Sequence, residues 1–252
     1  MIKHGWSTNF DVDILDAEGP DLELAVPNGR SIQKNFVGKD IANYDSMLVL
    51  SHFKGRYAES NAEMVRLDKS RRSVVLMGNS ITDGWPAADS VFFVDHGFVG
   101  RGISGQVSAQ MRERFADDVI ALEPNKVVIL CGTNDIAEND GPYDEDATFA
   151  NVVAMVDMAI DNAIVPYVCS VLPARCYRWN LNITDGPQKI ERLNSRLRQF
   201  AEEKGIVYID YFTSMVADDS ESLREDYTFD GVHPILDGYK VMEEILLRAI
   251  GN

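Results

Sequence analysis

The sequence predicts a three-layer α/β/α sandwich, in which a parallel β-sheet lies between two layers of helices. From residue 73 onward, short apolar segments rich in β-branched residues alternate with segments of helical periodicity. The apolar segments are nearly continuous, which is typical of strands buried on both faces. Because repeated strand–helix–strand units form right-handed crossovers, such strands run parallel in one sheet.

Each element is predicted by its own pattern. Strands are expected at residues 73–77 (SVVLM), 97–99, 126–131 (KVVILC), 164–172 (IVPYVCSVL) and 206–209 (IVYI). Apolar residues at helical spacing predict helices between and after them: Val107, Met111 and Phe115; Val152, Val156, Ala159, Ile160 and Ala163; Ile190, Leu193, Leu197 and Phe200; Val241, Met242, Ile245, Leu246 and Ala249. In this fold class, a functional site is sought in the loops after the carboxyl ends of the strands.

Residues 1–55 do not continue this alternation. Turn signals at Gly19-Pro20 and Pro27-Asn28-Gly29 separate short mixed segments, and residues 47–50 (MLVL) predict one strand. The segment 40–55 (DIANYDSMLVLSHFKG) resembles an internal piece of an uncharacterised bacterial family associated with iron–sulfur domains, but it contains no cysteine, so no cofactor is expected there. We predict an N-terminal appendage of unknown role, residues 1–55, and a main domain, residues 56–252.

Composition narrows the classes of partner. Among 252 residues, 40 are acidic and 24 basic, and the formal net charge of −16 disfavours binding to nucleic acid or to an anionic membrane. No apolar run approaches the roughly 20 residues that span a bilayer, and the first 30 residues lack a signal-peptide core. A cytoplasmic location is therefore expected for the chain as written, or a periplasmic or secreted one if a leader has been removed. The three cysteines are too few and too scattered for a zinc site, so no metal is expected.

Two glycine-containing loops follow predicted strands. Gly78-Asn79-Ser80 leads from a strand into a helix and presents a hydroxyl at the mouth of the sheet, where Ser80 is either a nucleophile or a helix cap. Gly105 lies in the second loop, Gly102–Gln106, where it either exposes a backbone N–H or simply allows a tight turn.

Two further segments carry polar side chains suited to catalysis. Asn134, in Gly132-Thr133-Asn134-Asp135, is either an amide donor to an anion or part of a turn, and Asp135 better suits a capping role. Asp230 precedes His233 by three residues, so its carboxylate can hold one imidazole nitrogen while the other faces a substrate. Together the four segments supply a nucleophile, a base, an orienting acid and oxyanion donors.

These segments resemble the four motif blocks of the SGNH (GDSL-type) esterases. GNSIT, RGISGQ, GTND and DGVHP occur in the family's order, and the resemblance runs from about residue 56 to residue 252. It implies a flavodoxin-like five-stranded sheet, with Ser80 as nucleophile, His233 as base and Asp230 as its orienter. It also implies an oxyanion hole formed by the Ser80 and Gly105 N–H groups and the Asn134 side chain. Asn79 stands where the family usually has Asp, and we expect altered loop polarity with hydrolysis retained.

The substrate is expected to be a small-molecule or oligosaccharide ester. Bacterial family members with similar GNSIT, GRGISGQ and GTNDIAEN motifs deacetylate carbohydrates, and the predicted loop after residue 172 offers Arg175, Tyr177 and Trp179 for sugar binding. Trp85 is a further candidate wall of the pocket or a core residue. Alternatives are a lysophospholipase or thioesterase, a phospholipid acetylhydrolase-like enzyme, and a non-catalytic carbohydrate-binding protein. Self-association is left open.

Overall fold

The computed structural model describes residues 22–25, 34–37 and 55–251. The chain divides into two compact units, Met1–His52 and Phe53–Asn252. In the first unit, β1 (Leu22–Ala25) pairs antiparallel with β2 (Lys34–Val37). The strand expected at residues 47–50 lies outside the described residues, and the separate role of residues 1–55 stays a prediction.

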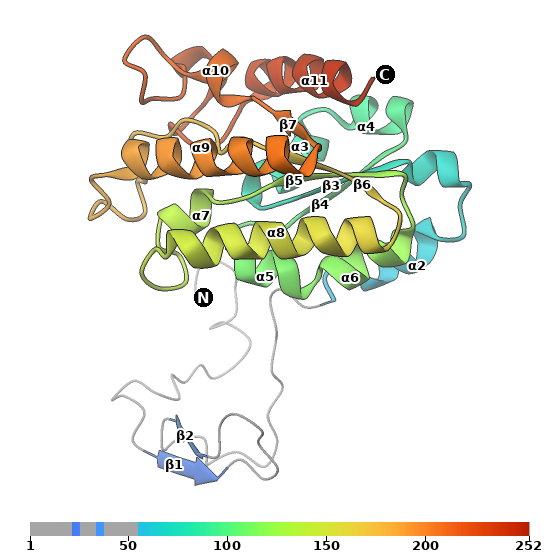
Figure 1. Ribbon diagram of the computed structural model, residues 1–252, viewed down its shortest axis with the longest axis horizontal. Helices are drawn as coiled ribbons and strands as arrows, with labels where there is room; N and C mark the ends of the chain where they lie inside the picture. The colour runs from blue at the N-terminus through green and yellow to red at the C-terminus, as the bar shows by residue number, and fades with distance from the viewer. Residues whose placement is uncertain (1–21, 26–33, 38–54, 252) are drawn as a thin grey trace, which may run out of the picture. The chain divides into compact units, whose positions relative to one another are not determined.

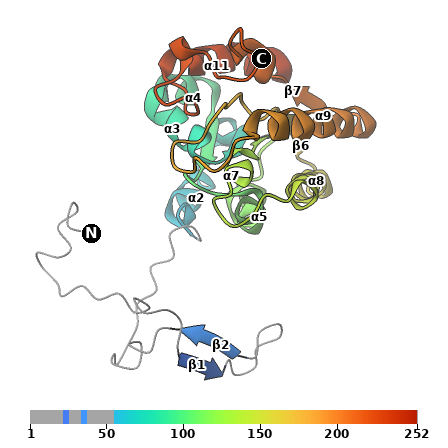
Figure 2. The ribbon, with the colours of Figure 1, turned by 90° about the vertical axis from the view of Figure 1, so that its left-hand side faces the viewer.

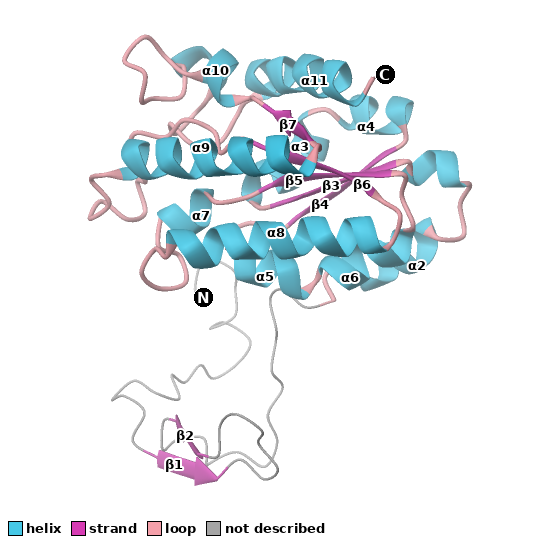
Figure 3. Cartoon of the chain, in the orientation of Figure 1, coloured by secondary structure: helices cyan, strands magenta, loops and turns pink. Residues whose placement is uncertain are grey.

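The second unit is built on five parallel strands, as predicted (Figure 3). They are β3 (Val74–Gly78), β4 (Phe98–Gly102), β5 (Lys126–Leu130), β6 (Val165–Cys169) and β7 (Val207–Ile209). Their order in the sheet is β4-β3-β5-β6-β7, so the first strand lies inside the sheet and the chain moves outward on both sides of it. This flavodoxin-like order confirms the predicted fold class and places a switch point beside β3.

Helices cover both faces of this sheet (Figures 1 and 2). The helices are α2 (Ala58–Met64), α3 (Ser80–Ala88), α4 (Ser90–His96), α5 (Ser108–Glu113), α6 (Phe115–Asp118), α7 (Thr133–Ile136), α8 (Glu145–Asp161), α9 (Gly186–Lys204), α10 (Phe212–Met215) and α11 (Leu236–Ile250). Side chains of α5, α6, α8 and α9 share one buried cluster, and those of α3, α4 and α11 share another. The three-layer arrangement is therefore confirmed.

Successive side chains of a strand point to opposite faces of the sheet, so the strands contribute side chains to both clusters. Val75 and Met77 of β3 pack with the α8 side, whereas Val74 and Leu76 pack with the α11 side. All five residues of β3 are buried, because helices exclude water from both faces of a central parallel strand.

Two strands differ from the predicted length by more than one residue. β4 extends to Gly102, beyond the expected residues 97–99, and β6 ends at Cys169 although apolar residues continue to Leu172. After β6, the Val171 N–H donates to Asn194 Oδ1 (2.7 Å), and Asn194 Nδ2 donates back to the Val171 carbonyl (3.0 Å). A side chain of α9 thus takes the hydrogen bonds that a longer strand would have given to a neighbour. In the described part of the chain, no helix is both long and apolar enough to cross a membrane.

Candidate active site

Ser80 stands at the carboxyl edge of the sheet, as the first residue of α3. Asn79 caps this helix, since its side-chain oxygen accepts the Ile81 N–H (3.1 Å). At Gly78, a Cβ atom would lie only 2.0 Å from Thr82 Oγ1, so only glycine permits this tight strand-to-helix turn. The other side-chain atom of Asn79, Nδ2, is buried without a hydrogen-bond partner. Through its side-chain oxygen, Asn79 acts as the N-cap of α3.

His233 and Asp230 meet Ser80 from the segment before α11. His233 Nε2 lies 2.8 Å from Ser80 Oγ, and His233 Nδ1 lies 2.7 Å from Asp230 Oδ2. Asp230 Oδ1 accepts the backbone N–H groups of Val232 (2.9 Å) and His233 (2.8 Å), which fixes the carboxylate against the imidazole. The fold thus brings Ser80 into one hydrogen-bonded row with two side chains, Asp230 and His233, that lie 150 and 153 residues later in the sequence.

The surroundings of Asp230 favour its ionised form. Partial burial of the carboxyl alone would raise its pKa, but the hydrogen bonds from the His233 N–H, the imidazole and the Val232 N–H outweigh this effect. The pKa of Asp230 is consequently held below its ordinary value. An ionised Asp230 accepts a hydrogen from Nδ1 of a neutral imidazole, which leaves Nε2 free to accept the Ser80 proton.

Gly105 and Asn134 follow the strands on either side of β3. Gly78 pairs with Gly102 of β4 and with Leu130 of β5, so all three strands end at one level. Gly105 adopts a φ of +83° and is exposed, and Asn134 is buried in the first turn of α7. Asn134 Nδ2 donates to the Gln106 carbonyl (2.9 Å), which leaves its second amide hydrogen available.

Two backbone groups complete this arrangement. Among the hydrogen bonds of residues 55–251, neither the Ser80 N–H nor the Gly105 N–H donates to another group of the chain. Asp135, in contrast, accepts the N–H of Ser108 at the start of α5 with both carboxylate oxygens (3.0 Å each). Asp135 therefore caps a helix, as the sequence indicated. Among the described residues, the N–H groups of Ser80 and Gly105 are left free to donate to a ligand.

Two of the four candidate substrate-binding residues are in the core. Trp85 is 1% exposed, packs against Tyr239 (5.3 Å between ring centroids) and donates its indole N–H to Glu243 (3.2 Å). Tyr177 is 0% exposed. Neither ring presents a face to a ligand, so Trp85 has the core role of the two considered for it, and the substrate-binding assignment of Tyr177 is wrong.

The other two candidates are at the surface. Arg175 pairs with Asp219 (3.4 Å) and Glu221 (3.7 Å), and it does not line the pocket that contains Ser80. Trp179 is 46% exposed, its ring centroid lies 6.0 Å from that of His233, and its indole N–H donates to Asn139 (2.8 Å). Of the four residues, Trp179 is the one whose exposed ring adjoins the hydrogen-bonded row.

An open pocket of about 650 Å³ gives access to Ser80 and His233. Its lining includes side chains that sequence reasoning missed, among them Asp83, Ser104 and Phe229. Phe229 is 67% exposed and stacks on His233 (5.8 Å between centroids). Asp83 follows Ser80 by three residues and therefore shares its helix face, a spacing that could have revealed it. Among the described residues, no group of three or more His, Cys, Asp or Glu side chains could hold a metal ion.

The fold and the hydrogen-bonded row define a hydrolase of the α/β/α sandwich class. Residues 76–241 match the GDSL-like lipase/acylhydrolase family, and the chain belongs to that family. It is a carboxylic ester hydrolase.

Solved structures and a curated relative agree with this assignment. The chain is similar to a candidate acylhydrolase of Bacteroides fragilis (48% identity, TM-score 0.76, covering 79% of this chain and 95% of that one). It is also similar to a GDSL-like lipase of Bacteroides thetaiotaomicron (45% identity, TM-score 0.75, covering 78% and 96%). An acetylxylan esterase of Geobacillus stearothermophilus is 25% identical over 160 residues, which are 61% of this chain and 71% of the relative.

Proposed function

We propose that the protein is a serine esterase that removes acetyl or other short acyl groups from oxygen esters, with O-acetylated carbohydrates as its substrates. The observation that carries the proposal is the row Ser80–His233–Asp230, with contacts of 2.8 and 2.7 Å, open to a pocket. A hydroxyl hydrogen-bonded to an imidazole, which is in turn oriented by a carboxylate, is the arrangement that activates serine as a nucleophile.

In the first half of the proposed reaction, Ser80 Oγ attacks the ester carbonyl carbon while His233 Nε2 accepts the hydroxyl proton. Asp230 stabilises the resulting imidazolium through the hydrogen bond to Nδ1. The tetrahedral intermediate then collapses, the bond to the alcohol oxygen breaks, and His233 returns the proton to that oxygen. The products of this half are the free alcohol and an acyl group on Ser80.

In the second half, water replaces the alcohol. His233 accepts a proton from water as the water oxygen attacks the acyl carbon, and the proton returns to Ser80 Oγ when the carboxylic acid leaves. In both halves, negative charge develops on the former carbonyl oxygen. The unpaired N–H groups of Ser80 and Gly105 and the free hydrogen of the Asn134 amide are the proposed donors to it.

Polar groups in the pocket support a sugar substrate. Asp83 and Ser104 line the pocket beside Ser80 and offer groups that can hydrogen-bond to hydroxyls, while Trp179 offers a flat ring beside His233. The acetylxylan esterase relative indicates the same class of substrate. The lipid-ester alternatives would use the exposed Phe229 ring as a contact for an acyl chain. Membership of a hydrolase family removes the non-catalytic carbohydrate-binding alternative.

A substrate series tests the proposal. Acetate release is measured from acetylated xylo-oligosaccharides, and kcat/KM is measured for p-nitrophenyl esters from acetyl to octanoyl. We expect hydrolysis of the acetylated sugars and a kcat/KM that falls from acetyl to butyryl and longer chains. Octanoyl esters that are hydrolysed faster than acetyl esters, with no release from the sugars, would establish the lipid-ester alternative instead.

A further inference from the structure

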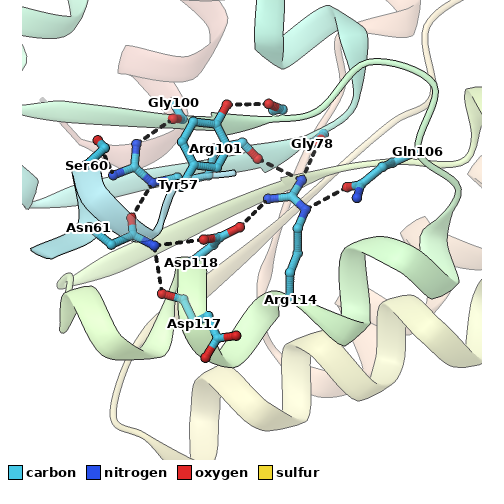
Figure 4. Close-up of polar contacts among 11 residues, drawn as sticks. Tyr57, Ser60, Asn61, Gly78, Gly100, Arg101, Gln106, Arg114, Asp117 and Asp118 are labelled. Carbon is cyan, nitrogen blue, oxygen red and sulfur yellow. Dashed lines mark hydrogen bonds and ion pairs between the residues drawn. The ribbon is translucent and has the colours of Figure 1, made fainter. Parts of the chain in front are cut away.

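A buried polar network lies behind the loop that carries Gly105 (Figure 4). Its centre is Arg114, which follows α5 and whose side chain is 4% exposed. Its other members are Gln106, Asp118, Asn61 and Arg101, all of them buried. Charged side chains are rarely buried in a core unless they are fully paired. The hydrogen-bond partners of these buried charges therefore indicate what the cluster does.

The Arg114 guanidinium uses its donors on four acceptors. Nε donates to Gln106 Oε1 (2.6 Å), and Nη1 donates to Asp118 Oδ2 (2.9 Å). Nη2 donates to two main-chain carbonyls, those of Gly78 (2.9 Å) and Arg101 (3.0 Å). Figure 4 shows the guanidinium between these groups, with Gln106 on one side and Asp118 on the other.

These acceptors belong to the segments that carry the reacting groups. Gly78 ends β3 two residues before Ser80, and Gln106 directly follows Gly105. The Gln106 carbonyl in turn accepts the hydrogen bond from Asn134 Nδ2 (2.9 Å). The Arg114 side chain therefore connects β3, which leads to Ser80, with the turn that contains Gly105. Through Gln106, it is also connected to Asn134.

The rest of the network holds Arg114 in place. Asp118 also accepts a hydrogen bond from Asn61 Nδ2 (2.8 Å), and Asn61 Oδ1 accepts one from Arg101 Nε (2.8 Å). Burial of the guanidinium lowers the pKa of Arg114, and the bond to Asp118 opposes this effect. A buried ion pair of this kind adds little net stability compared with apolar residues of similar volume. A planar fork with five N–H donors, however, can fix several carbonyls at once, which an ammonium or an apolar side chain cannot do.

We propose that Arg114 is a positioning residue, which holds the Gly105 turn and Asn134 in register with Ser80 so that the oxyanion donors converge. This inference rests on the proposed function. Lysine at position 114 could keep the ion pair with Asp118, but it could not bridge Gln106, Gly78 and Arg101 in one plane.

The first test is kinetic, with a matched control. In Arg114→Lys we expect kcat to fall roughly 10- to 100-fold while KM stays nearly constant, because small misplacement of catalytic groups acts on the transition state. The control is Arg72→Lys. Arg72 is another buried arginine, and it lies just before the amino end of β3, far along the strand from Ser80. Its side chain donates hydrogen bonds to the carbonyls of Leu122 (2.7 Å) and Leu67 (2.8 Å). We expect Arg72→Lys to lower Tm and to leave kcat near wild type. A wild-type kcat in Arg114→Lys, with a loss of Tm like that of the control, would overturn the proposal.

A double-mutant cycle with Asn134→Ala separates positioning from general destabilisation. If Arg114 acts through the oxyanion donors, the kcat loss in Arg114→Lys/Asn134→Ala is at least about threefold smaller than the product of the single losses. Losses that multiply would overturn the proposal while leaving the oxyanion role of Asn134 intact. A wild-type kcat in Asn134→Ala alone would instead overturn that role in the proposed function, and this inference with it.

A second variant keeps the test decisive if Arg114→Lys does not fold. Gln106→Met removes the acceptor of Arg114 Nε and retains the main-chain carbonyl that Asn134 contacts. We expect a smaller fall in kcat, with KM unchanged and the same non-additivity toward Asn134→Ala. Turnover at the wild-type rate in a folded Gln106→Met protein would contradict the proposed role.

Discussion

The loop after β3 and the loop after β6 leave the same edge of the sheet, but they place their side chains by different means. After β3, the chain enters α3 within two residues. The Asn79 cap and the tight turn at Gly78 hold Ser80 in a defined position at the start of the helix. After β6, residues 170–183 form no helix or strand longer than an isolated bridge, and packing decides which side chains face outward. A short hydrogen-bonded motif therefore fixes the position of Ser80, whereas the position of each side chain in the longer loop depends on packing.

Removal of the Ser80 hydroxyl is expected to have the largest effect. Ser80→Ala should lose on the order of 10⁶ in kcat, as nucleophile removal does in serine proteases, with little change in Tm. Ser104→Ala is the matched control, because Ser104 also lines the pocket but its hydroxyl donates to Asp83 (2.7 Å). We expect a far smaller loss for the control. Ser80→Ala activity within about tenfold of wild type, on highly purified protein, would exclude the β3 loop as the source of the nucleophile.

The next effect concerns the segment that holds His233. Asp230→Asn should lower kcat by up to about 10⁴, as in a serine protease, with little change in KM. Because the pKa of Asp230 lies below its ordinary value, its carboxylate stays charged between pH 5 and 8. The fall in kcat/KM that we expect toward pH 5 therefore does not come from Asp230 and is assigned to loss of the base that accepts the Ser80 proton. A flat profile over this range, with full activity in His233→Ala, would contradict the assignment.

Asn134→Ala distinguishes a catalytic amide from a structural one. If the amide donates to the oxyanion, kcat should fall by about 10²- to 10³-fold, equivalent to roughly 2.7 to 4 kcal/mol. Loss of the bond to the Gln106 carbonyl alone would instead lower Tm and spare turnover. Both quantities are measured on the same variant.

The loop after β6 is expected to affect the substrate more than the reaction. Trp179→Ala should raise KM for an acetylated xylo-oligosaccharide about five- to tenfold, equivalent to roughly 1 to 1.4 kcal/mol, and leave KM for p-nitrophenyl acetate unchanged. Arg175→Ala is the control from the same loop, because its side chain pairs with Asp219 and Glu221 and not with the pocket. Equal effects of Trp179→Ala on both substrates would remove the sugar-binding role.

The smallest effect is expected from the N-terminal unit. Deletion of residues 1–55 should leave kcat and KM nearly unchanged, because the proposed reacting groups all follow Gly55. Deletion of residues 1–57 should differ, since it removes the Arg56 pair with Asp83 (2.8 Å) and the Tyr57 contacts with Gly102 and Arg101. We expect a loss of roughly 1 to 3 kcal/mol in the free energy of unfolding for the longer deletion alone. A folded but inactive 1–55 deletion would show that the segment reaches the site.

Most of the fold, and the proximity of Ser80, His233 and Asp230, could be predicted from the sequence for identifiable reasons. Strands such as residues 73–77 are continuous apolar runs, and the Asp230–His233 spacing lets one carboxylate oxygen bind a backbone N–H while the other binds the imidazole. Five residues of helix turn the chain by about 140° from Ser80, which directs Trp85 toward the core, one of the two roles considered for it. Tyr177 lies in an irregular loop without periodicity, so its burial had no signal in the sequence.

The Arg114 network could not be predicted for a different reason. Arg114 bonds to Asp118 and Gln106, which are four and eight residues away, but other contacts of the network join residues 28 to 57 positions apart, as between Gln106 and Asn134 or between Asn61 and Asp118. Only the assembled strands and α5 bring these polar groups together. A sequence pattern predicts local geometry and periodic burial, whereas a polar contact between distant segments produces no such pattern.

Covalent labelling of Ser80 tests the central claim most directly. The protein is treated with a fluorophosphonate, which phosphonylates an activated serine, and the modified peptide is identified by mass spectrometry in wild type, Ser80→Ala and His233→Ala. We predict one adduct on Ser80 that appears together with loss of esterase activity, no adduct in Ser80→Ala, and much slower labelling in His233→Ala. Complete inactivation with the adduct on another residue, or esterase activity that survives full labelling of Ser80, would contradict the account.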